Sequence, residues 1–200
     1  QLEDPKTAKK IVKRGVIELV TPGVSYSDNV LVNKENTFLA AVYFGKRSTG
    51  VAFLDASTGE FYAAEGKNSY IDKLLSNLAP KEVIYPKGYE EEFSESFGTK
   101  YYTYRVDDWM FSENGAREKL LNQFQVTSLK GYGIDNMPSA IIAAGAVLYY
   151  LEYTEHRHTK HIASISRIDE DKFVWIDKFS IRNLELFASN SGQEGCSLAE

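Results

Sequence analysis

Hydrophobic positions in the middle of the chain predict alternating strands and helices. Phe38 to Phe44 is a nearly continuous apolar run, which is typical of a buried strand. Gly50 to Asp55 and Glu60 to Ala64 flank a turn sequence, so these two strands are expected to pair antiparallel. Shorter apolar runs predict further strands at Val83 to Tyr85 and Tyr101 to Val106.

Three other segments have the periodicity of helices. Apolar residues between Tyr70 and Leu78 recur at the spacing of one helix face, and Pro80 stops the pattern. The segment from Gly115 to Phe124 has one apolar and one polar face. Pro138 opens a longer helix to about Glu155, whose alanine-rich first half can lie close against a sheet or another helix. Together these elements predict an α/β unit.

The two ends of the chain differ from this central unit. Lysine and arginine cluster in residues 6–14, and Thr21-Pro22-Gly23 then breaks a short helical stripe. After residue 156, a basic turn leads into a predicted hairpin, with strands at Ile162 to Ile168 and Lys172 to Ile176. The chain begins with Gln1 rather than Met, so we expect a piece of a longer protein, in which the tail resembles the beginning of a further domain.

Composition narrows the class of protein. Hydrophobic residues at 43% and charged residues at 26% are typical of a folded globular domain. A net charge of −5 disfavours a protein that coats DNA by itself. Cys196 is the single cysteine, which excludes an internal disulfide and fits a reducing compartment. The longest apolar run, Ala140 to Leu151, is too short to span a bilayer, and no signal-peptide pattern precedes it, so a cytoplasmic location is expected.

Two motifs invite a ligand-binding interpretation that their spacing does not support. Gly45-Lys46-Arg47-Ser48 lacks the glycine and hydroxyl positions of a phosphate-binding loop, so we expect a hairpin turn and no ATP binding. His156, His158 and His161 lie where a helix meets a loop, with no cysteine nearby. Cations at a helix C-terminus complement its dipole, so we expect a structural role and no metal site.

Acidic residues provide the one candidate for catalysis. Asp55, Glu60 and Asp72 could together hold divalent ions for phosphodiester cleavage. Asp55 is also placed to cap the turn that follows it, and we favour that role. A separate polar trio, Asp177, Arg182 and Asn183, is expected to organise a domain junction through hydrogen bonds. No nucleophile–base pair is evident, so the residues alone indicate an α/β domain without an evident active site.

Four stretches of the chain carry a resemblance to one known family. They are Glu3-Asp4-Pro5 through Thr21-Pro22-Gly23, Gly50 to Asp55 with Ser57 to Phe61, Ala143 to Leu151, and Ile176-Asp177 with Arg182 to Leu186. Taken in order, they resemble the MutS family of DNA mismatch-repair proteins. The first matches the segment that leaves the family's mismatch-recognition domain. The second and third match the hairpin and the final helix of its connector domain, and the fourth matches the beginning of its helical core domain.

This resemblance implies a fold and a division of the chain. The fold is α/β, a ribonuclease-H-like mixed sheet with flanking helices, followed by a truncated start of a helical domain. Residues 1–20 would be a linker from the mismatch-recognition domain, 21–158 the connector domain (MutS domain II), and 159–200 the start of the core or lever domain (MutS domain III). The family's mismatch-reading Phe-x-Glu would precede this chain. Phe93-Ser94-Glu95 and Phe111-Ser112-Glu113 match that string inside the connector, so its role is not assigned to them.

The resemblance also implies a non-catalytic function. The connector relays between mismatch recognition and the ATPase domain and offers a docking surface to the MutL protein, at positions that match Glu118 and Lys119. An ordinary solvated helix face remains the alternative for these two residues. No cofactor is expected in this chain, whereas the full-length parent would use ATP and magnesium, form a homodimer and bind mismatched duplex DNA. Residues 6–14 are expected to give this chain at most weak, salt-sensitive DNA binding.

The alternative function is a metal-dependent nuclease on the same scaffold. Ribonuclease-H-like nucleases place metal-binding carboxylates on their first and fourth strands. The predicted strands Phe38 to Phe44 and Val83 to Tyr85 contain none. The alternative therefore depends on Asp55, Glu60 and Asp72 alone.

Overall fold

The computed structural model describes residues 21–23, 36–154, 159–170, 180 and 183–184. Its elements alternate as the sequence pattern predicts, and each predicted strand and helix of the central unit is present within a few residues of its expected bounds. In chain order they are β1 (Phe38–Phe44), β2 (Thr49–Asp55), β3 (Phe61–Gly66), α1 (Asn68–Leu78), β4 (Glu82–Pro86), α2 (Glu90–Phe97), β5 (Thr103–Val106), η2 (Asp108–Phe111), α3 (Glu113–Phe124), η3 (Lys130–Tyr132), α4 (Pro138–Tyr153) and β6 (Ser166–Arg167).

The strands form one mixed sheet in the order β5-β4-β1-β2-β3-β6. β1, β2 and β3 are an antiparallel meander, in which Phe38 faces Asp55 and Phe44 faces Thr49. β4 pairs parallel with β1 and β5 pairs parallel with β4. This mixed sheet with flanking helices confirms the predicted fold class. The helical domain expected after it falls mainly outside the described residues.

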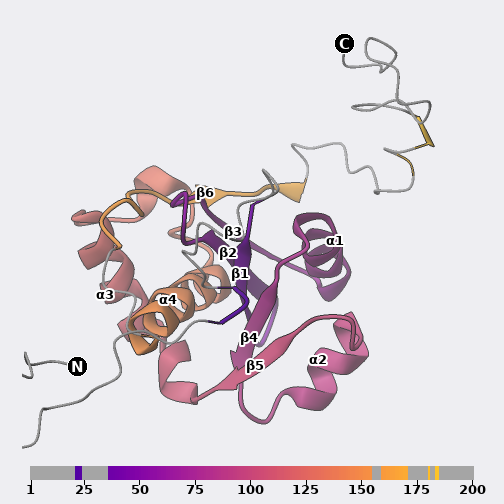
Figure 1. The fold of residues 1–200 in the computed structure, drawn as a ribbon. Helices are drawn as coiled ribbons and strands as arrows, with labels where there is room; N and C mark the ends of the chain where they lie inside the picture. The colour runs from indigo at the N-terminus through magenta and orange to yellow at the C-terminus, as the bar shows by residue number, and fades with distance from the viewer. Residues whose placement is uncertain (1–20, 24–35, 155–158, 171–179, 181–182, 185–200) are drawn as a thin grey trace, which may run out of the picture.

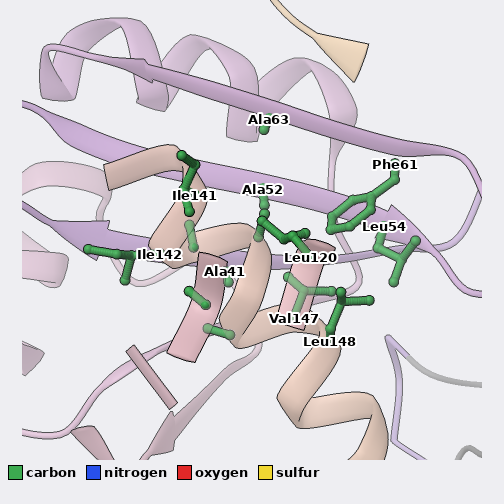
Figure 2. Packing of buried hydrophobic residues seen from close by; sticks show 14 of the residues in the cluster. Ala41, Ala52, Leu54, Phe61, Ala63, Leu120, Ile141, Ile142, Val147 and Leu148 are labelled. Carbon is green, nitrogen blue, oxygen red and sulfur yellow. The ribbon is translucent and has the colours of Figure 1, made fainter. Parts of the chain in front are cut away.

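Helices cover both faces of the sheet, as Figure 1 shows. α3 and α4 lie on one face, and α1 and α2 lie on the other. Each face has its own hydrophobic core, because alternate residues of each strand point to opposite sides of the sheet. Figure 2 shows the larger core, where Ile141 and Val147 of α4 pack near Ala52 and Leu54 of β2.

α4 makes an unusually close approach to its neighbours. Its residues from Ser139 to Leu148 are all buried, and most of them are small. A Cβ atom at Gly145 would lie 2.3 Å from the Cβ of Ala116 on α3, and one at Gly50 would lie 2.1 Å from the backbone of Ser139. The alanine-rich sequence therefore packs against a sheet and a helix at once, as its composition predicts.

Two local predictions are corrected by the structure. The structure contains a helix, α2, that the sequence pattern does not predict, because its only buried side chains are Phe93 and Phe97 and two positions give too short a periodic signal. The strand expected over 162–168 is reduced to β6, which pairs parallel with β3. Ile162 and Ile165 instead lie in the core beside α4. The second strand of that expected hairpin lies outside the described residues. The domain boundaries expected at residues 20 and 158 stay predictions. In the described part of the chain, no helix is long and apolar enough to span a membrane.

Gly50→Ala is expected to destabilise the domain by about 1–3 kcal/mol, because the added methyl group must push α4 away from β2. Urea unfolding measures this as a lower midpoint. Gly131→Ala is the matched control, since a Cβ there would meet nothing within 4 Å. Equal midpoints for the two variants would contradict the close packing of α4.

Candidate interaction surface

The residues predicted to bind a partner lie on α3 and have different surroundings. α3 begins at Glu113, where the Ser112 hydroxyl caps it by accepting a hydrogen bond from the Gly115 backbone N–H. Ala116, Leu120 and Phe124 point into the core. Glu118 therefore lies on the opposite, exposed side of the helix.

Lys119 is engaged with α4. Its Nζ atom lies 2.6 Å from a carboxylate oxygen of Glu152 and 5.2 Å from the centre of the Tyr149 ring. The Tyr149 hydroxyl in turn donates to the carbonyl oxygen of Gly115 at 3.0 Å. Lys119 thus joins α3 to α4, whereas Glu118 lies beside it on the outward face of α3.

A polar hollow of about 490 Å³ lies at the C-terminal end of α3. Gln123 stands beside it and holds the following loop, because its amide nitrogen donates to the carbonyl oxygens of Thr159 at 2.8 Å and Ile162 at 3.0 Å. The exposed side chains of Asn122 and Gln125 continue the outward face on which Glu118 lies. This face can donate and accept hydrogen bonds along most of the helix.

A buried carboxylate at the beginning of β4 is not predicted by the sequence pattern. Glu82 begins β4 opposite Leu39 and is 1% exposed. Its carboxylate accepts hydrogen bonds from the Tyr150 hydroxyl at 2.8 Å and from the Gly23 backbone N–H at 3.0 Å. The strand was predicted to begin one residue later, and a single acid before an apolar run carries no signal of burial.

This carboxylate holds the segment 21–23 against the domain. A Cβ at Gly23 would lie 2.8 Å from the Glu82 Cβ, so a residue without a side chain is required at that point. Burial, and then the nearby charge of Glu82, raise the pKa of the Tyr150 hydroxyl far above its usual value near 10. Tyr150 therefore remains a hydrogen-bond donor to Glu82 throughout the physiological range.

The three carboxylates of the nuclease alternative serve other contacts. Asp55 caps its turn, as favoured from the sequence: one carboxylate oxygen accepts from the Ser57 backbone N–H at 2.9 Å and hydroxyl at 2.6 Å, and the other accepts from the Thr37 N–H at 3.0 Å. Glu60 accepts from the Asn36 side chain, and Asp72 pairs with Lys100 at 3.8 Å. Within the described ranges, no group of three or more His, Cys, Asp or Glu residues is placed to hold a metal ion.

The remaining sequence candidates are structural where they are described. The Gly45 N–H donates to the Ser48 carbonyl at 3.1 Å, which confirms a hairpin turn between β1 and β2. A ring nitrogen of His161 lies 2.7 Å from the Ala56 carbonyl oxygen. Phe93 and Phe111 are buried, so neither is placed to stack on a base. His156, His158, Asp177 and Arg182 lie outside the described residues, and Asn183 is exposed.

The fold and its contacts define an α/β domain whose candidate functional feature is an exposed helix face. Residues 37–163 match the family model described as MutS domain II. The chain is 57% identical over 189 residues to the DNA mismatch repair protein MutS of Bacteroides fragilis, 56% identical over 189 residues to that of Flavobacterium psychrophilum, and 51% identical over 200 residues to that of Parabacteroides distasonis.

These alignments cover 94% to 100% of this chain but 22% to 23% of the relatives. The chain therefore spans about a fifth of the length of the curated relatives it matches. It belongs to the MutS domain II family, which confirms the resemblance seen in the sequence.

Tyr150→Phe is expected to flatten the loss of stability at alkaline pH. The folded state keeps this hydroxyl proton while an unfolded tyrosine loses it near pH 10, so the free energy of unfolding falls as pH rises above about 10, by up to about 1.4 kcal/mol per pH unit for this one proton. Urea unfolding of wild type and variant between about pH 8 and pH 11 measures how steeply the free energy of unfolding falls with pH in each protein.

At neutral pH the same variant is expected to be about 1–3 kcal/mol less stable, since the Glu82 carboxylate loses a buried partner. Parallel stability curves over the whole pH range would contradict the assignment of the raised pKa to Tyr150.

Proposed function

We propose that this chain is the non-catalytic connector module of a longer DNA mismatch-repair MutS protein, relaying between mismatch recognition and an ATPase domain and offering a docking surface to MutL. Its membership of the MutS domain II family supports the first part. The observation that carries the second is the junction of α3 and α4, where Glu118 is exposed and Lys119 is tied to Glu152.

The contacts provide a physical route for such a relay. A partner on α3 would act on Lys119 and so on Glu152 and Tyr149 of α4. The next residue of α4, Tyr150, is hydrogen-bonded to Glu82, which holds Gly23. A surface contact on α3 is thus connected, through rigid packed elements, to the segment that enters the domain from the N-terminal side.

The longer protein carries the other functions of this proposal. Its relatives are named DNA mismatch repair proteins, so we infer that it binds mismatched duplex DNA. The resemblance to the MutS family further implies that it works as a homodimer. ATP and magnesium would be bound by domains outside this chain, which itself needs no cofactor. A cytoplasmic location fits these roles. The chain's net charge of −5 leaves its own DNA binding weak and sensitive to salt.

The double variant Glu118→Ala/Lys119→Ala is expected to weaken binding of the N-terminal part of MutL about tenfold, or about 1.4 kcal/mol, because it removes the exposed carboxylate and the ammonium group at the junction. Isothermal titration with variants of equal thermal stability measures this.

The matched control is Lys73→Ala/Glu95→Ala, which removes the same two charges from exposed positions of α1 and α2 on the other face of the sheet. Equal weakening by both variants would indicate a general charge effect. Unchanged binding by both would leave the α3 face an ordinary solvated surface.

The non-catalytic part of the proposal has its own test. We expect no magnesium-dependent cleavage of single- or double-stranded DNA or RNA by this chain, because the Asp55 carboxylate is occupied by its turn and Asp72 pairs with Lys100. A gel assay with and without magnesium measures this. Cleavage that requires magnesium and disappears in Asp55→Ala, at a temperature where both proteins are folded, would establish the nuclease alternative instead.

A further inference from the structure

A group of aromatic rings is exposed beside the α3–α4 junction. Trp109 of η2 is 57% exposed, Tyr153 at the end of α4 is 55% exposed, and Tyr104 of β5 is 43% exposed. These are three of the five large hydrophobic side chains that are exposed in the described part of the chain. Such a concentration of apolar area in one place is typical of a protein interaction site.

The exposed rings rest on two further rings of α4. Trp109 packs edge-on against Tyr149, with ring centres 5.4 Å apart. Tyr104 and Tyr153 both contact Tyr150, at 5.9 Å and 6.4 Å. We call these five residues the aromatic cluster. Because Tyr150 is fully buried and Tyr149 is hydrogen-bonded to α3, the exposed rings stand on a rigid support.

Rigid aromatic rings suit a binding surface for an energetic reason. They offer a large contact area and lose little conformational entropy when a partner covers them. Tryptophan and tyrosine are accordingly the residues most enriched among those that dominate binding energy. The aromatic cluster is also continuous with the proposed docking face, since the Lys119 ammonium group lies over the Tyr149 ring.

The charges around the aromatic cluster select the kind of partner. Lys87 pairs with Asp107, and Lys119 pairs with Glu152, so both nearby ammonium groups are neutralised within the domain. The exposed acids Asp108, the first residue of η2, and Glu113, the first residue of α3, form no ion pair with any described residue. Among the described residues, the rim of the aromatic cluster is therefore net negative, and it would attract a positively charged segment.

We propose that the aromatic cluster is the apolar centre of the docking face and receives a segment of MutL that carries both basic and apolar side chains. This inference rests on the proposed function, and it changes the assignment of binding energy within that face. The rings anchor the partner, whereas Glu118 and Lys119 lie on one side of the contact. Asp108 and Glu113 steer the basic segment toward the rings.

The anchor role is tested by titrating the chain with the N-terminal part of MutL. Trp109→Ala/Tyr153→Ala is expected to bind at least about tenfold more weakly than wild type, because two exposed anchors are removed. Tyr102→Ala is the matched control: this side chain is 59% exposed but touches no ring of the aromatic cluster, so its loss leaves binding unchanged.

A second measurement leaves the surface intact. The chain has two tryptophans, so Trp175→Phe makes Trp109 the single tryptophan. Addition of MutL is then expected to shift its fluorescence emission to shorter wavelength, because water is removed from the indole ring.

The charged rim has its own test. Asp108→Asn/Glu113→Gln is expected to slow association of the chain with MutL at low salt, with the difference from wild type disappearing at high salt.

The outcomes separate this inference from the proposed function. If wild type binds MutL, but binding survives Trp109→Ala/Tyr153→Ala and the Trp109 emission does not move, the aromatic cluster is not the anchor and docking elsewhere on α3 stands. If wild type does not bind at all, the MutL-docking function and this inference are both overturned. Weakening by Trp109→Ala/Tyr153→Ala but not by Tyr102→Ala, together with the emission shift, establishes the anchor.

Discussion

The close contact of α4 with the sheet is the constraint on which the rest of this domain depends. Gly50 on β2 lets the backbone of Ser139 approach, and Gly145 lets α3 approach from the other side. Because small residues bring the backbones together, α4 is buried along most of its length and cannot slide without opening both contacts. The last turns of α4 are consequently held in place, and both the Lys119 contact and the aromatic cluster are built on them.

Those last turns connect the interior of the sheet to the surface. Tyr150 reaches inward to the buried carboxylate of Glu82, while Tyr149, one residue earlier, reaches toward Lys119 and Trp109. Consecutive residues of a helix point about 100° apart, so one helix can serve the core and a neighbouring helix at once. The domain thus has a physical link between the segment at Gly23 and the face of α3.

Burial of Glu82 illustrates how a polar group can position a chain. A carboxylate removed from water is costly unless its oxygens accept hydrogen bonds, and here the Tyr150 hydroxyl and the Gly23 N–H supply them. The contact also constrains the residue at position 23, because a Cβ at Gly23 would lie 2.8 Å from the Cβ of Glu82. For a connector module, such a contact suits the task of holding an incoming segment in one orientation.

The order of the elements other than α2, and the small-residue character of α4, could be predicted from the sequence because they follow from local periodicity and composition. The turn role of Asp55 could be predicted for the same reason, since the turn groups that it accepts from are within three residues. The family assignment also came from the sequence, as the comparison with MutS domain II confirms.

Tertiary structure alone decided the features that join distant residues. Glu82 and Tyr150 are 68 positions apart, and nothing near either residue indicates that they meet. Trp109 of η2, Tyr104 of β5 and the tyrosines of α4 likewise come from three different elements, so their aromatic cluster is invisible to any local pattern. Local patterns report which side of an element is apolar, whereas only the packing of whole elements determines which side chains face one another and which are left exposed to a partner.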